Sequence, residues 1–398
     1  MSKVRDQYEA YPYPARDPAD EAKRLIIGSP SHPLELDHFL YGGQRDWSVP
    51  LRALVAGGGT GDGLVQLAQL LSDAGRPYEI TYLDLSTASR RSAEARAEAR
   101  GLAGITFVTG SLLEAADLGR FDYIDCCGVL HHLPDPPAGF RALRAALAEG
   151  GGMGMMVYAP YGRSGVYPLQ EAFGALLGDQ PTETRLKAAR AIMARLPEGH
   201  PFRRNPNVGD HRDSDAGFYD LLLHSRDRAY RVDELASVLE ATDWELSGFV
   251  MEAQYDLGRF VDTMPDALTA IERMALAEKL SGIIKTHTAY VVAKSSGTRP
   301  ARGRNRALIP HLKGAEPAAL GRAIGSGQVP KLTLNGLGAE LRLPREAGRL
   351  IAAIDGRRSL SDIAQATGAD PIGFGALWTR IERALEPWGL LLYSRLLV

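Results

Sequence analysis

The sequence contains little cysteine, little net charge and no long apolar run. Its 398 residues include two cysteines, the adjacent Cys126 and Cys127, and carry a formal net charge of −2 at pH 7. Two neighbouring cysteines cannot form a disulfide framework, and they suit a reducing compartment. A nearly neutral chain has no general attraction for nucleic acid or an anionic membrane. With no apolar run of about twenty residues and no signal-peptide pattern, the sequence predicts a cytoplasmic protein that does not span a membrane.

Glycine, in contrast, is concentrated in LVAGGGTGDG at residues 54–63. The apolar residues 51–56 predict a buried strand, and leucines at helical spacing from Leu64 predict a helix that ends at Gly75. The glycines between them let the backbone approach a ligand without a Cβ in the way. A strand, a glycine turn and a helix N-terminus form a nucleotide-type site, because free backbone N–H groups face the ligand.

The glycine spacing argues against a dinucleotide. Dinucleotide sites have glycines at relative positions one, three and six of this turn. Each candidate triplet fails here, because Asp62 or Leu64 takes the sixth position or Thr60 takes the third. A nicotinamide-dependent enzyme is therefore disfavoured.

Short apolar strands alternate with helices after the glycine turn. Strands are predicted at 78–83, 105–108, 123–129 and 153–158. This rhythm predicts parallel βαβ units and a doubly wound α/β sheet. The ligand of such a sheet lies at the carboxyl ends of the strands.

Asp84 follows the second strand, about twenty residues beyond the glycine turn. A carboxylate at this place can accept hydrogen bonds from both hydroxyls of a ribose. The alternative is a plain helix cap, since Ser86 and Thr87 open the next helix. The ribose role is the favoured interpretation.

Four motifs occur in one order: AGGGTGDG, YLDLSTAS, FDYIDCCGVLHHLPDP and GGGMGMMVYAP. Together they resemble class I S-adenosylmethionine (SAM) methyltransferases, most closely a bacterial group with an N-terminal tyrosine-proline segment, over about residues 5–295. The resemblance implies a seven-stranded Rossmann-like sheet whose last strands, 244–250 and 287–293, form an antiparallel edge. It implies SAM as cofactor and S-adenosylhomocysteine as product. The cofactor residues that it implies are Gly57, Gly58, Gly59, Gly61, Asp84, Leu85, Ser111, Leu112, Gly128, Val129 and Leu130.

Two positions depart from the family pattern. The family often has one acid two residues before the first motif glycine and another after the third strand, where this chain has Val55 and Ser111. Losing both weakens the hold on the methionine ammonium and the adenine amine, although a serine hydroxyl can still accept one hydrogen bond. The alternative to an active enzyme is a non-catalytic SAM-binding regulatory or scaffold protein.

His131 and His132 are the predicted catalytic residues. They follow the fourth strand, where the acceptor approaches. Methyl transfer needs a base only if the acceptor arrives protonated, and a neutral histidine can serve near pH 7. The alternative is a structural turn closed by Pro134 and Asp135.

The first fifty residues predict a cap over the site. In YEAYPYP, two prolines exclude a helix interior and present Tyr11 and Tyr13 on a non-helical segment. A lid that excludes water and a strap anchored by two rings both fit this segment. Tyr41 and Trp47 are assigned to the same cap.

A long insertion, about residues 160–231, follows the fifth strand and is typical of a lid or binding element. Its His200, Asp210 and His211 have loose spacing and no cysteine beside them, so no metal site is predicted. The side chains predicted to meet the acceptor or to close over it are Tyr11, Tyr13, Tyr158, Tyr161, His211 and Tyr219.

The end of the chain predicts a separate small α+β domain. KLTLNGLGAELRL predicts a hairpin across Asn335 and Gly336, and three helices and a closing strand follow. This order resembles winged-helix folds, which include DNA-binding modules and peptide-binding domains of modified-peptide pathways. The predicted domains are a cap at 1–50, a methyltransferase domain at 51–294 with the insertion 160–231, a linker at 295–307 and the winged-helix-like domain at 308–398.

The third helix of this last domain argues against DNA. It offers Arg380 and Arg383 against Glu382 and Glu386, whereas DNA reading needs a basic recognition helix. The expected role is contact with a peptide or protein, or a structural element of a homodimer. A peptide or protein acceptor is therefore favoured over a small molecule, which the sequence does not exclude.

Overall fold

The computed structural model describes residues 3–398, and a seven-stranded sheet forms its centre. The strand order is β3-β2-β1-β4-β5-β7-β6. All strands are parallel except β7, which is antiparallel to both β5 and β6. The predicted doubly wound sheet with an antiparallel pairing at one side is confirmed. The strands are β1 (Leu51–Ala56), β2 (Tyr78–Asp84), β3 (Ile105–Thr109), β4 (Phe121–Cys127), β5 (Leu147–Tyr158), β6 (Trp244–Phe249) and β7 (Thr286–Ala293).

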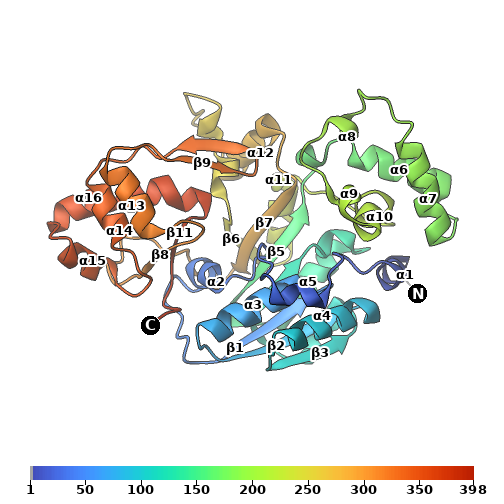
Figure 1. Cartoon of the computed structure of the whole chain (residues 1–398), viewed down its shortest axis with the longest axis horizontal. Coiled ribbons are helices and arrows are strands. Elements are labelled where there is room, and N and C mark those ends of the chain that lie inside the picture. Colours follow the sequence, from blue (N-terminus) through green and yellow to red (C-terminus); the bar gives the residue numbers. More distant parts are fainter. Residues whose placement is uncertain (1–2) are drawn as a thin grey trace.

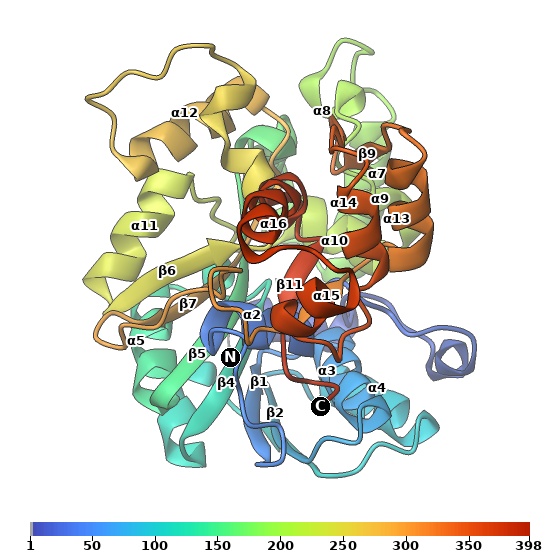
Figure 2. The ribbon, with the colours of Figure 1, turned by 90° about the vertical axis from the view of Figure 1, so that its left-hand side faces the viewer.

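Helices cover both faces of the sheet, as Figure 2 shows. On one face, Leu64, Leu67 and Leu71 of α3 recur at helical spacing and pack against the buried residues of β1 and β2. On the other face, Phe140 and Leu143 of α5 enter a second apolar core. The first face carries α2 (Pro33–Leu40), α3 (Asp62–Asp73) and α4 (Thr87–Ala99), and the second carries α5 (Pro136–Ala146), α11 (Val232–Ala241) and α12 (Ala270–Ser281).

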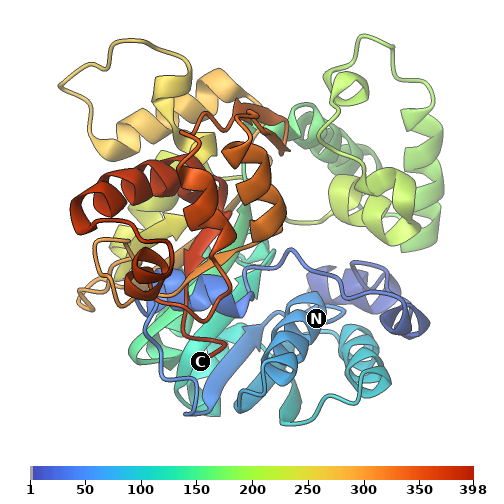
Figure 3. The ribbon, with the colours of Figure 1, turned by 60° about the vertical axis from the view of Figure 1, so that its left-hand side comes forward.

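The insertion after β5 is helical and has an apolar core of its own, which includes Phe173, Leu186, Phe202 and Leu222. Figures 1 and 3 show it next to α1 (Lys3–Ala10) and on the opposite side of the molecule from the C-terminal segment. Its helices are α6 (Val166–Leu177), α7 (Thr182–Met193), α8 (Pro201–Arg204), α9 (Asp210–Asp213) and α10 (Asp215–Leu223).

The C-terminal segment, residues 308–398, also contains its own apolar core, in which Trp378 and Ile381 are buried. The predicted hairpin across Asn335 and Gly336 is confirmed, and both turn residues have the positive φ that a tight hairpin needs. The three predicted helices and the closing strand are also present, whereas β8 and α13 were not predicted. The elements are β8 (Pro310–Leu312), α13 (Pro317–Gly325), β9 (Lys331–Leu334), β10 (Leu337–Glu340), α14 (Ala347–Ala352), α15 (Leu360–Ala366), α16 (Pro371–Leu385) and β11 (Leu391–Tyr393).

Asp37 of α2 joins the C-terminal segment to the sheet. Its fully buried carboxylate accepts hydrogen bonds from Trp47 Nε1 at 2.9 Å, Ser394 Oγ at 2.7 Å and the Arg395 N–H at 2.9 Å. A buried carboxylate is tolerated when donors surround it. The predicted linker is also anchored at its midpoint, since the buried Ala301 donates its N–H to the His38 carbonyl at 2.9 Å.

Tyr41 and Trp47 do not belong to a cap over the ligand edge, and this prediction was wrong. The Tyr41 hydroxyl donates to the carbonyl of Asp122, at the amino end of β4, at 2.8 Å. Trp47 is held by Asp37, as described above. Both rings therefore lie near the amino ends of the strands, where they fix the segment that leads into β1.

Within residues 3–398, no helix combines the length and the apolar character that crossing a bilayer requires.

Candidate active site

The glycine turn after β1 is so tightly packed that side chains do not fit. Gly57 and Gly61 have φ values of 70° and 98°, in the left-handed region that favours glycine. A Cβ on Gly57 would lie 2.5 Å from Val129 Cγ2, and one on Gly61 would lie 2.9 Å from Ala93 Cβ. The turn therefore presents bare backbone at the start of α3.

Asp84, at the carboxyl end of β2, contacts this turn directly. Its Oδ2 accepts from the Gly59 N–H at 2.8 Å and its Oδ1 accepts from the Ser86 N–H at 2.8 Å. Burial raises the pKa of Asp84 above its ordinary value, while these N–H groups oppose the rise. Ser86, whose Oγ accepts from the Ser89 N–H at 3.1 Å, is the cap of α4, so helix capping does not account for Asp84.

Four other predicted cofactor residues have mixed positions. Leu85 is partly exposed next to Asp84, and Ser111 caps the short helix that follows β3 by accepting from the Leu113 N–H at 3.2 Å. The side chains of Leu112 and Leu130 are buried in the core below the sheet edge, so only their backbone can face a ligand.

The N-terminal segment lies across the carboxyl edge of the sheet. A Cβ on Gly59 would meet the carbonyl oxygen of Tyr13 at 3.0 Å, and Thr60 Oγ1 donates to the Pro14 carbonyl at 2.7 Å. Glu9 reaches the first turn of α4, where it accepts from the Thr87 N–H at 2.5 Å. The backbone of residues 13 and 14 therefore lies against the glycine turn. The lid role and the strap role of this segment both stay predictions.

A network of partly and fully buried ion pairs holds this segment in place. Arg16 donates to Asp62 at the start of α3 through two bonds of 2.9 and 2.6 Å. Asp62 also accepts from Arg96 at 2.7 Å, and the fully buried Arg96 donates to Glu21 at 2.5 Å. Removing one partner of such a network leaves a buried charge uncompensated.

A polar cluster lies next to the N-terminal segment at the carboxyl ends of β4 and β5. At its centre is the buried Asp220 of α10, which accepts from the Tyr8 hydroxyl at 3.0 Å and from the Tyr158 hydroxyl at 3.3 Å. Burial raises the pKa of Asp220. The members of this polar cluster are Tyr8, His131, His132, Tyr158, Arg163, Asp220, His224 and Asp227.

Three histidine rings meet in the polar cluster. His131 is fully buried, and neither ring nitrogen has a hydrogen-bond partner within residues 3–398. His132 stacks on His224 with ring centroids 3.8 Å apart, and its Nδ1 donates to the Arg226 carbonyl at 2.8 Å. Burial lowers the pKa of His131 and of His224, so both rings are neutral at pH 7.

The comparisons with known proteins agree with this geometry. Residues 54–153, from the glycine turn to β5, match the family described as a methyltransferase domain. The uncharacterised protein syc1184_c of Synechococcus sp. is 32% identical over 300 residues, which cover 72% of this chain and 70% of that protein. The chain belongs to the class I SAM-dependent methyltransferases. Its cofactor is SAM, and the predicted Rossmann-like fold is confirmed.

Two solved structures share the fold of this methyltransferase. PKMT2 from Rickettsia typhi in complex with AdoHcy has a TM-score of 0.61 at 12% identity, covering 92% of this chain and 76% of that chain. Another structure of PKMT2 from Rickettsia typhi also has a TM-score of 0.61 at 12% identity, covering 93% and 77%.

The residues predicted to meet the acceptor do not all lie together in the structure. Tyr11 stacks on Tyr219 with ring centroids 5.2 Å apart, and Tyr158 is in the polar cluster. Tyr161 lies instead near Glu278 of α12, and His211 packs against Phe202 at a centroid distance of 4.8 Å. Within residues 3–398, neither of these two side chains forms a hydrogen bond or a ring contact with the polar cluster.

Sequence reasoning missed Asp220, Asp227 and Arg163. Arg163 donates to Asp227 at 3.1 Å and its guanidinium lies 3.6 Å from the Tyr158 ring centroid. The sequence does contain a signal for Asp220, which interrupts the apolar run GFYDLLL. A carboxylate that is buried among apolar neighbours needs hydrogen-bond partners, so its presence in such a run indicates a polar site. Its partners Tyr8 and Tyr158 are too far away in sequence to be paired without the fold.

Asp125 of β4 was also missed. It is buried and pairs in register with Val55, the position where the family often has an acid. Its Oδ2 accepts from Ser29 Oγ at 2.9 Å and also from Ser31 Oγ. Burial raises the pKa of Asp125 to about 6. An acid therefore lies beside Val55, on the neighbouring strand.

We expect Asp125→Asn to change how stability depends on pH. Because the pKa is raised in the folded protein, the native state binds the proton more tightly than the unfolded state does, and wild-type stability falls as pH rises from the unfolded value near 4 to about 6. Relative to Asp125→Asn, the wild type should lose at most about 3 kcal/mol of unfolding free energy between pH 4 and 7. Urea unfolding at several pH values measures this difference. Asp117→Asn, at an exposed position, is the control; an Asp125→Asn profile parallel to the wild type would contradict the assignment.

Proposed function

We propose that this methyltransferase acts on a peptide or protein, and that its C-terminal segment binds part of that acceptor. The observation that carries this proposal is a groove of about 620 Å³ on the C-terminal segment. Its lining includes Val329, Leu343, Pro344, Arg380 and Arg383.

The groove combines an apolar floor with positive charge. Arg380 and Arg383 are exposed one turn apart on α16, and no ion pair is formed by either within residues 3–398. Guanidinium groups bind carboxylates through paired hydrogen bonds. The groove therefore suits an extended segment with acidic and apolar side chains, rather than a small uncharged molecule.

The shared fold supports a joint role for the sheet and the C-terminal segment. The 8% of the chain outside its alignment with PKMT2 from Rickettsia typhi amounts to about 32 residues, fewer than the 91 residues of the C-terminal segment. Most of the C-terminal segment therefore belongs to the shared architecture. A domain retained beside the catalytic sheet in both chains is more readily explained by a large acceptor than by a small one.

The glycine turn and Asp84 fit SAM, because bare backbone and a neighbouring carboxylate suit its methionine end and its ribose. When bound, SAM supplies a methyl carbon activated by positive sulfur, which an acceptor lone pair attacks in line with the breaking carbon–sulfur bond. Gly57, Gly59 and Gly61 would hold the methionine end, and Leu85 and Ser111 would flank the adenine. Residues 8–16 cover this edge and would exclude water from it.

The polar cluster is the proposed place for the acceptor atom. The two tyrosine hydroxyls fix both oxygens of Asp220. Burial raises the pKa of Asp220, which brings it closer to the pKa of an effective proton acceptor near neutral pH. The predicted catalytic residues His131 and His132 lie in the same cluster, at the carboxyl end of β4.

The ribose assignment is tested by Asp84→Ala. Loss of a charged hydrogen-bond acceptor should weaken SAM binding, measured by calorimetry, by roughly 1.5 to 3 kcal/mol. Ser86→Ala is the control, because it removes the cap of α4 and keeps the carboxylate. Equal effects of the two substitutions, or unchanged affinity in Asp84→Ala, would contradict the assignment.

The acceptor class is tested with cell extract and SAM carrying a heavy methyl group, followed by mass spectrometry of the separated polypeptide and small-molecule fractions. We expect label in polypeptides. The double variant Arg380→Ser and Arg383→Ser should lower that label at least about fivefold without changing SAM affinity, since the groove loses the charges that bind carboxylates. Arg349→Ser, an exposed arginine on α14, should match the wild type. Label confined to small molecules would refute a polypeptide acceptor.

The lid role of the N-terminal segment is tested by Tyr11→Ala, which removes the stacking on Tyr219. If the segment is a lid, methyl incorporation should fall by about tenfold at an unchanged melting temperature, because water enters the edge. Tyr11→Phe keeps the ring and should behave as the wild type. A lower melting temperature with normal turnover would identify a structural strap instead.

A further inference from the structure

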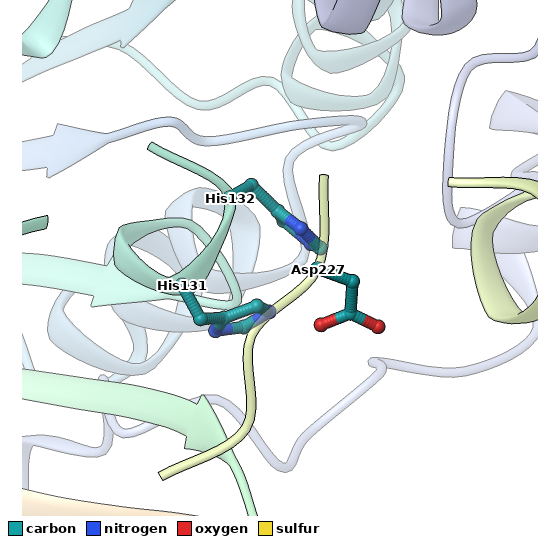
Figure 4. Close-up of side chains that lie close together, drawn as sticks. All are labelled: His131, His132 and Asp227. Atoms are coloured by element: carbon teal, nitrogen blue, oxygen red, sulfur yellow. The ribbon is translucent and has the colours of Figure 1, made fainter. Parts of the chain in front are cut away.

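Within the polar cluster, three side chains offer unused ligand atoms to one another. His131, His132 and Asp227 each present one nitrogen or oxygen, and these atoms all lie within 4.8 Å of one another. Figure 4 shows the two rings, from the turn after β4, and the carboxylate, from the loop between α10 and α11, converging on one region. We propose that His131, His132 and Asp227 form a binding site for a divalent transition-metal ion.

Unpartnered buried atoms are the first reason. Both nitrogens of the fully buried His131 lack a hydrogen-bond partner within residues 3–398, and so does Oδ1 of Asp227. Buried polar atoms almost always have a hydrogen-bond partner. Unpartnered atoms on two residues that lie close together in space, His131 and Asp227, therefore need an explanation. A shared cation would bind one nitrogen of His131 and Oδ1 of Asp227 at once.

The second reason is the hydrogen bonding behind the ligand atoms. His132 Nδ1 donates to the Arg226 carbonyl at 2.8 Å, so in the neutral ring Nε2 carries the lone pair. This backbone contact is the one that orients metal-binding histidines in known sites. On Asp227, Oδ2 accepts from Arg163 at 3.1 Å and from Gln170 at 2.9 Å, which leaves Oδ1 for an ion.

A second group of three, His132, Asp220 and His224, is also close together, but the ligand atoms of Asp220 and His224 already have partners. His224 Nδ1 accepts from the Arg226 N–H at 3.0 Å, so its Nε2 carries the proton and faces the Tyr8 hydroxyl at 3.3 Å. Both oxygens of Asp220 accept from tyrosine hydroxyls. These contacts assign the ion to the first group.

Charge and donor type indicate the kind of ion. The polar cluster holds two carboxyl groups, Asp220 and Asp227, and one guanidinium, Arg163, so its acidic groups outnumber its arginine and favour a cation. Two imidazoles and one carboxylate suit Zn²⁺, Fe²⁺, Mn²⁺ or Co²⁺, whereas Mg²⁺ and Ca²⁺ prefer oxygen ligands alone. Two bonds to such an ion span at most about 4.2 Å, so the three groups need to close by only a fraction of an ångström.

This proposal departs from the sequence prediction of no metal, which considered His200, His211 and Asp210 and not this cluster. A histidine whose lone pair is on a metal cannot also accept a proton, so the proposal replaces the general-base role predicted for His131 and His132. It does not depend on which acceptor is methylated.

The test uses the full chain without a polyhistidine tag, stripped with a chelator and titrated with Co²⁺ while visible absorption is followed, then with Zn²⁺ in competition. We expect about one Co²⁺ per chain with a dissociation constant in the micromolar range or below, displaced by Zn²⁺. His131→Phe and Asp227→Asn should each weaken binding at least tenfold. His224→Phe and His211→Ala should bind within about twofold of the wild type.

Circular dichroism shows whether each variant is folded, and if His131→Phe is not, Asp227→Asn decides. Absence of stoichiometric binding by the wild type would overturn the proposal, and so would wild-type affinity in a folded Asp227→Asn variant. Weakened binding in His224→Phe alone would move the ion to the second group and contradict the assignment. Because binding is measured without SAM or an acceptor, this outcome is independent of the proposed acceptor class.

Discussion

The parallel pairing of β1 with β2 and β4 is the constraint on which the site depends. It brings the glycine turn, Asp84 and the histidine turn to the same edge of the sheet, although they are separated by up to about 75 residues in sequence. The Gly59 N–H then donates to Asp84, so two strand ends share one hydrogen bond. A register shift between these strands would separate the backbone turn from the carboxylate, and no local feature of either loop could compensate.

Two segments outside the sheet complete this edge. The N-terminal segment is fixed over the glycine turn by Arg16 and Asp62, and its Tyr8 extends into the polar cluster. The insertion after β5 supplies Asp220 and Asp227 from the other side. The N-terminal segment and the insertion are therefore connected through the hydrogen bond from the Tyr8 hydroxyl to Asp220. The C-terminal segment is joined to the same body through Asp37 of α2, which places the basic groove on a fixed support.

Local sequence patterns were sufficient to predict the parallel strands of the sheet, and the family resemblance supplied its antiparallel edge. The strand and helix positions follow from apolar periodicity, and the start of α4 was recognised from Ser86, which does cap that helix. The polar cluster could not be predicted in the same way, because its members come from four distant segments and each looks ordinary in its own context. His131 and His132 were found because they are adjacent to each other, whereas Asp220 and Asp227 needed the fold. Tyr41 and Trp47 were misplaced because aromatic composition does not tell which end of a strand a ring will reach.

A crystal structure of the full chain with S-adenosylhomocysteine would show whether the glycine turn and Asp84 hold the cofactor. The account predicts the amino-acid end of the ligand against residues 57–61 and both ribose hydroxyls within hydrogen-bonding distance of the Asp84 carboxylate. A ligand bound elsewhere, or a ribose that does not contact Asp84, would contradict it.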